Sequence, residues 1–89
     1  MTRAELSEAS DLCRQAAEET TGEARERLYE QSNQLATLAD RDRGPDHGRL
    51  ARHMNALDEL AADLDGEAAD VVSEARDLVG EYRQGVAGV

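Results

Sequence analysis

The sequence predicts an all-α protein in which two helical hairpins, four helices in total, pack as a small antiparallel bundle. Three observations predict this fold. Apolar residues recur at alternating spacings of three and four along four segments, which keeps them on one face of a helix. Capping and chain-breaking residues lie between those segments. The two halves of the chain also resemble each other, and 89 residues suffice for a single domain, here residues 1–89.

The first hairpin is expected at about residues 2–41. Its two apolar stripes are Leu6, Ala9, Cys13, Ala16 and Thr20, then Ala24, Leu28, Gln31, Leu35 and Leu38. Thr2 with Glu5 matches the capping box, in which a hydroxyl accepts a first-turn N–H and a carboxylate reaches back to the cap. Thr20 with Glu23 repeats this pattern at the start of the second helix.

A Pro-containing loop over residues 42–47 is expected to join the hairpins, because Pro45 cannot lie inside a helix and Gly44 and Gly48 flank it. Asp46 suits the N-cap of the third helix. The second hairpin is expected at about residues 48–84. Its stripes are Leu50, Met54 (or His53), Leu57, Leu60 and Leu64, then Ala68, Val72, Ala75, Val79 and Tyr82.

A weak internal repeat supports this organisation. When the sequence is shifted by 44 residues, the triplet at 22–24 (Gly-Glu-Ala) falls on the identical triplet at 66–68. Leu6 then falls on Leu50, and Leu35 on Val79. Residues 20–22 and 65–66 are each compatible with a tight turn or with a kink in a longer helix, and the repeat favours turns.

The charge is strongly negative and unusual in kind. Twenty acidic residues face ten basic ones, all of them Arg, which gives a net charge of −10. The chain has no Lys, Ile, Phe or Trp and is rich in Ala. In these features it resembles the small, acidic, single-domain proteins of unknown function found in halophilic archaea. The resemblance implies a salt-rich setting and a helical architecture, and it transfers no functional site.

The chain is expected to be cytoplasmic and to pair with a second copy. It contains no apolar run long enough to span a membrane and no export signal, and its single cysteine, Cys13, has no partner for a disulfide or a zinc site. Cys13 is expected to be a small buried hydrophobe. The shortage of large apolar side chains predicts a thin core, which a homodimer would complete.

The sequence indicates a non-enzymatic interaction or structural protein, with no cofactor and no metal. HExxH, GxSxG, GxGxxG and the phosphate-binding Lys motif are all missing. Neither His47 nor His53 has a Glu three residues before it, as di-iron bundles require. An unknown protein partner is therefore expected, and nucleic acid is disfavoured because the charge repels it.

Residues 41–53 (RDRGPDHGRLARH) stand apart because they hold four arginines and both histidines. One interpretation is a polar connection whose arginines pair with neighbouring acids. The alternative is a regulator that binds nucleic acid or a phosphorylated ligand through this segment. Its candidate contact residues are Arg41, Arg43, Arg49, Arg52 and His53.

We predict that the helicity of the protein rises sharply between low and molar KCl. Repulsion between the negative charges opposes the compact state in dilute buffer. In molar salt the Debye length falls to about 3 Å, so most of this repulsion is screened. Circular dichroism across a KCl titration measures this. Full cooperative folding in salt-free neutral buffer would contradict the prediction.

Overall fold

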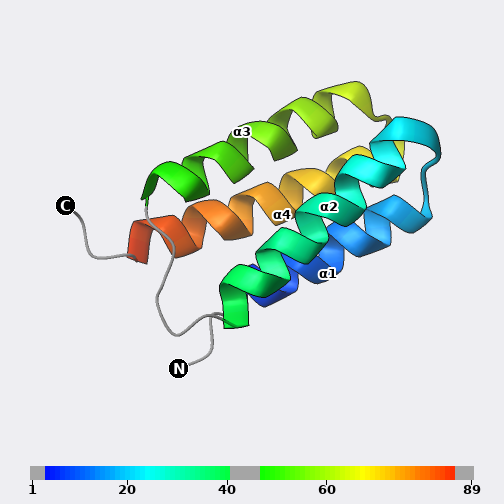
Figure 1. Cartoon of the computed structure of the whole chain (residues 1–89). Coiled ribbons are helices and arrows are strands. Elements are labelled where there is room, and N and C mark those ends of the chain that lie inside the picture. The colour runs from blue at the N-terminus through cyan, green and yellow to red at the C-terminus, as the bar shows by residue number, and fades with distance from the viewer. Residues whose placement is uncertain (1–3, 41–46, 86–89) are drawn as a thin grey trace.

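The computed structural model describes residues 4–40 and 47–85, and these form four helices (Figure 1). The helices are α1 (Ala4–Glu18), α2 (Gly22–Asp40), α3 (His47–Asp63) and α4 (Gly66–Gly85). The predicted all-α fold is confirmed. The first helix of the second hairpin begins at His47, one residue earlier than expected. Thr2, Pro45 and Asp46, for which a cap or a break was predicted, lie outside the described residues.

Both hairpins turn at a glycine in the left-handed region of the backbone. Gly22 has φ +68° and Gly66 has φ +63°, and each is the first residue of the second helix of its hairpin. Glycine adopts this conformation readily because it has no Cβ. Residues 20–22 and 65–66 are therefore turns between separate helices rather than kinks, and they occupy equivalent positions in the repeat.

The four helices form a ring that is closed on three sides. α1 packs closely against both α2 and α4, and α3 packs closely against α4 (Figure 1). α2 and α3 meet at only a few positions. The bundle is thus open along its α2/α3 side, although the repeat would make that side equivalent to the closed α1/α4 side.

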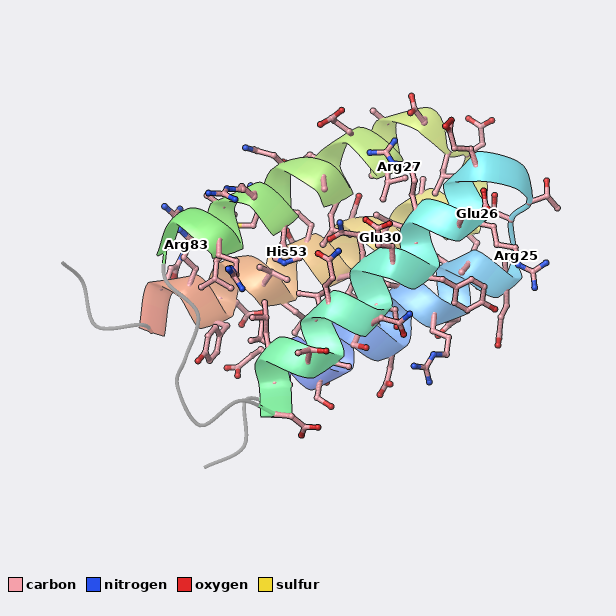
Figure 2. The ribbon with its side chains drawn as sticks, in the orientation of Figure 1. Arg25, Glu26, Arg27, Glu30, His53 and Arg83 are labelled. Atoms are coloured by element: carbon pink, nitrogen blue, oxygen red, sulfur yellow. The ribbon has the colours of Figure 1, made fainter. Side chains whose placement is uncertain are left out.

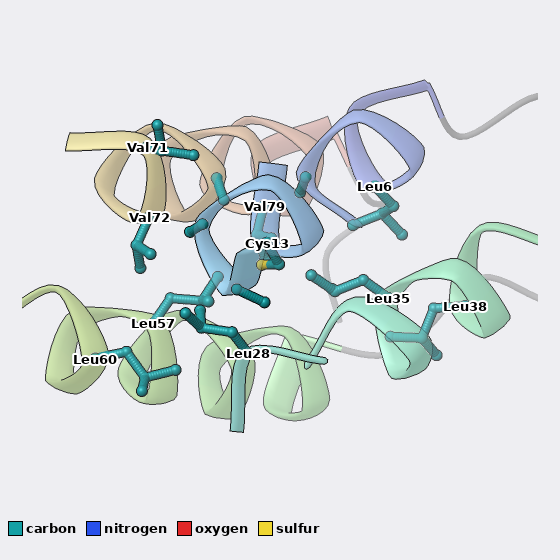
Figure 3. Packing of buried hydrophobic residues seen from close by; sticks show 14 of the residues in the cluster. Leu6, Cys13, Leu28, Leu35, Leu38, Leu57, Leu60, Val71, Val72 and Val79 are labelled. Atoms are coloured by element: carbon teal, nitrogen blue, oxygen red, sulfur yellow. The ribbon is translucent and has the colours of Figure 1, made fainter. Parts of the chain in front are cut away.

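The core follows the predicted stripes (Figure 3). Leu6, Cys13, Leu28 and Leu57 are among its fully buried side chains. Tyr29 and Tyr82 are partly buried against it. Two buried serines join α1 and α2: their Oγ atoms lie 3.1 Å apart, and the Oγ–H of Ser10 donates to the carbonyl oxygen of Ser32 at 2.8 Å. This bond satisfies a hydroxyl that would otherwise be costly to bury.

Acidic side chains cover much of the outer surface. Glu8, Asp11, Glu23 and Glu26, for example, are all exposed on α1 and α2. Every helix in the described part of the chain is too short or too polar to cross a lipid bilayer.

We predict that Gly22→Ala and Gly66→Ala each lower the free energy of unfolding by about 1–2 kcal/mol, because a Cβ is strained at positive φ. Space is not the reason, since an added Cβ would meet nothing within 4 Å at either position. Gly85→Ala is the matched control, because that site is also open and its backbone is not left-handed. Chemical denaturation measures all three. Equal effects at positions 22, 66 and 85 would contradict the assignment.

Candidate functional site: a polar pocket between α2 and α3

The open side of the bundle contains a pocket of about 420 Å³. From α2 it is lined by polar side chains and one leucine: Gln31, Asn33, Gln34, Thr37 and Leu38. From α3 it is lined by Arg49, Arg52 and His53. No carboxylate belongs to this lining, although the chain has twenty acidic residues.

His53 joins the two helices across the pocket. The residue is 7% exposed, and its imidazole extends from α3 toward α2 (Figure 2). Nδ1 lies 2.7 Å from Oε1 of Gln31. An amide oxygen can only accept, so the Nδ1–H donates and Nε2 of the neutral ring is left as an acceptor. The bond fixes the ring tautomer and connects α2 to α3, which otherwise meet at only a few positions.

The surroundings of His53 favour its neutral form. Burial lowers the pKa of His53 from its ordinary value of 6.5, and the positive charge of Arg49 lowers it further. The hydrogen-bond partner is an uncharged amide rather than a carboxylate, which would raise the pKa. His53 is therefore neutral at pH 7, and it lies beside two exposed arginines.

The repeat gives a physical reason why the α2/α3 side stays open. The positions equivalent to His53 and Gln31 in the other half are Ala9 and Ala75. Both alanines are fully buried, in the helices α1 and α4 that pack closely together. Small side chains allow two helix backbones to approach, whereas an imidazole and an amide hold them apart. The substitution of Ala by His and Gln thus accompanies the opening of one side.

The structure brings together three of the five residues predicted as a candidate contact site. Arg49, Arg52 and His53 line the same pocket, whereas Arg41 and Arg43 lie outside the described residues. The second hairpin was predicted from about residue 48, and α3 begins at His47, so the second half of the segment 41–53 is helical. Arg49 and Arg52 are helical residues whose positions the bundle fixes.

Sequence reasoning missed the contribution of α2. Gln31 was assigned only to an apolar stripe, and Asn33, Gln34 and Thr37 received no role. A signal was nonetheless present in the repeat, since Asn33 and Thr37 fall on the acids Asp77 and Glu81. Neutral residues at these positions distinguish the α2 surface from that of α4.

Cys13 lies away from this pocket in the core and is inert. Its side chain is fully buried, as predicted. Burial raises the pKa of the thiol to about 12, so the reactive thiolate is not populated at neutral pH. Within residues 4–40 and 47–85, no three side chains of His, Cys, Asp or Glu converge as metal ligands would.

Comparison with known proteins places the chain in a family. The model of a family of unknown function, DUF7553, matches residues 1–85. The chain belongs to this family. The family match agrees with the expected small helical protein of unassigned role, and it names no activity. No match was found among curated proteins or among solved structures.

We predict that the melting temperature falls as the pH is lowered from about 7.5 to about 5.5, and that His53→Gln reduces this dependence. The folded-state pKa of His53 lies below its unfolded value of 6.5, so the unfolded chain takes up the proton first. The stability that comes from keeping His53 neutral is thus fully present above pH 6.5, and it is lost as the pH falls toward the folded-state pKa of His53. Carboxylates stay largely ionised in this window.

Thermal denaturation followed by circular dichroism at several pH values measures the effect. Gln at position 53 keeps a polar side chain that does not titrate. An unchanged pH dependence in this variant would contradict the assignment.

Proposed function

We propose that this protein is a non-enzymatic interaction protein whose contact surface is the pocket between α2 and α3. The observation that carries the proposal is the lining of that pocket. Two arginines, a buried histidine and three side-chain amides surround a concave space in a chain that is acidic elsewhere. Concave sites with a few convergent polar groups are typical binding sites.

The chemistry of the lining supports binding rather than catalysis. A catalytic histidine commonly relies on a carboxylate that orients the ring and stabilises its charged form. His53 instead donates to the amide of Gln31, and burial disfavours its protonation. The single cysteine, a possible nucleophile, is sequestered in the core. Arginines and amides, in contrast, are well suited to hold a ligand through hydrogen bonds.

The proposal includes a cellular setting and an assembly. The net charge of −10 without lysine supports a salt-rich cytoplasm of a halophile. A homodimer is proposed because the core is built largely from Ala, Leu and Val, with few larger side chains. Sedimentation in high salt measures the assembly, and a dimer would have twice the chain mass of 9.7 kDa.

A regulator that binds nucleic acid or a phosphorylated ligand through residues 41–53 is the alternative. The arginines of the pocket favour contact with phosphate. The rest of the chain opposes nucleic-acid binding, because the net charge repels a long polyanion and nucleic-acid affinity depends on many basic contacts. The pocket also has no aromatic lining residue on which a base would stack.

Affinity capture in molar KCl, from a lysate of the organism that makes the protein, tests the proposed function. Three baits are compared: the unaltered protein, a pocket variant (Arg49→Gln with Arg52→Gln) and a control variant (Arg14→Gln with Arg25→Gln). All four arginines are exposed, and both variants change the charge equally. Arg14 and Arg25 are not lining residues, and Arg25 extends away from α3 (Figure 2).

We predict that the pocket variant loses captured protein or small molecule that the unaltered protein and the control variant both retain. Identical captured sets for the pocket variant and the unaltered protein would contradict the use of this surface. Pocket-dependent capture of nucleic acid would favour the alternative.

A further inference from the structure

The two halves of the chain differ in charge at equivalent positions. Arg49 and Arg52 of α3 correspond to Glu5 and Glu8 of α1. Asn33 and Thr37 of α2 correspond to Asp77 and Glu81 of α4. Four acids on the α1/α4 side are thus replaced by two cations and two neutral hydrogen-bonding groups on the α2/α3 side. All four replacements lie in the lining of one pocket.

The repeat register on which this comparison depends is confirmed by burial. Equivalent positions such as Leu6 and Leu50, or Leu35 and Val79, are fully buried in both halves. The turn glycines Gly22 and Gly66 share the left-handed conformation. The difference in charge is therefore not produced by a shift in alignment.

The lining is suited to an oxyanion. Guanidinium groups donate paired hydrogen bonds to carboxylate and phosphate oxygens. The amides of Asn33 and Gln34 supply further donors, whereas the hydroxyl of Thr37 already donates to the carbonyl oxygen of Asn33 at 3.0 Å. Neither the volume of the pocket nor the net charge of the chain favours a large polyanion. About 420 Å³ lies in the range of small-molecule sites, roughly 300–1,000 Å³, and a small anion avoids the acidic surface around the pocket.

We propose that the pocket between α2 and α3 binds a small oxyanion, either a phosphate ester or a carboxylate, through Arg49, Arg52 and the polar groups of α2. This inference rests on the proposed function and specifies the ligand class of that same site. The lone leucine of the lining, Leu38, leaves room for only a small apolar part in the ligand.

One acid limits the affinity of the site. Oε1 of Glu30 accepts a hydrogen bond from Nε2 of Gln34 at 3.4 Å, so a carboxylate lies beside the pocket without lining it. Its negative charge opposes an incoming anion, and the bond occupies one amide donor. Removal of this charge strengthens binding, an effect that loss of folding would not produce.

The test is a titration with inorganic phosphate, glycerol phosphate and succinate, followed by NMR of backbone and side-chain amides. It is done at the lowest KCl concentration that gives full helicity, because chloride competes for the same site. Phosphate and succinate separate the two sources of the oxyanion. A single-stranded oligonucleotide serves as the polyanion probe. We predict saturable shifts with at least one of the three small anions, confined to the pocket residues.

Four variants make the test specific. We predict that Arg49→Gln with Arg52→Gln weakens binding about tenfold or more, since two charge-assisted contacts are lost. Asn33→Asp with Thr37→Glu, which restores the acids of the other half, should weaken it by a similar factor. Glu30→Gln should tighten it severalfold. Arg14→Gln with Arg25→Gln should leave it unchanged. All the altered residues are exposed, and circular dichroism checks that each variant folds.

Several results would overturn the inference: no saturable shift with any small anion, equal affinity in all variants, or binding of the oligonucleotide alone. The capture experiment separates this failure from that of the proposed function. Pocket-dependent capture of a protein without anion binding would reject the ligand class and keep the contact surface, whereas loss of both would reject the two together.

Discussion

The architecture depends on how closely α1 packs against two neighbours at once. Its buried face consists mainly of small side chains, among them Ala9, Cys13 and Ala16. Small residues bring helix backbones near each other, so that α2 and α4 both lie against α1. Because α3 packs against α4, three sides of the bundle close. On the fourth side, the imidazole of His53 and the amide of Gln31 hold α2 and α3 apart. The pocket is a consequence of this arrangement.

The polar contacts at the helix pairs differ with their surroundings. In the α1/α2 pair, Ser10 donates to the backbone carbonyl of Ser32 in the buried core, where an unpaired hydroxyl would be destabilising. In the α3/α4 pair, Nε of Arg76 lies 3.1 Å from a carboxylate oxygen of Asp58 on the partly exposed surface, a contact worth little in water and less in brine. The bond from His53 to Gln31 lies between these extremes. It is buried on one side and borders the pocket on the other.

The internal repeat relates the fold to the candidate site. The two hairpins keep the same apolar register and the same turn glycines, because both are required to close the core. Surface positions are free of that requirement, and there the halves differ in charge. The α1/α4 side carries acids at these positions, as much of the outer surface does. The other combines arginines with amides, which is the chemistry expected of a surface that meets an anionic or polar ligand.

The sequence by itself determined the helices, their buried faces and the burial of Cys13, because these follow from local periodicity and from the cost of exposing apolar surface. It also singled out Arg49, Arg52 and His53 by their concentration in one segment. Only the tertiary structure decided that these three residues lie opposite α2, since the contact between His53 and Gln31 joins residues 22 apart in the chain. Spacing along a helix defines a face, but which helix lies opposite depends on the packing of all four.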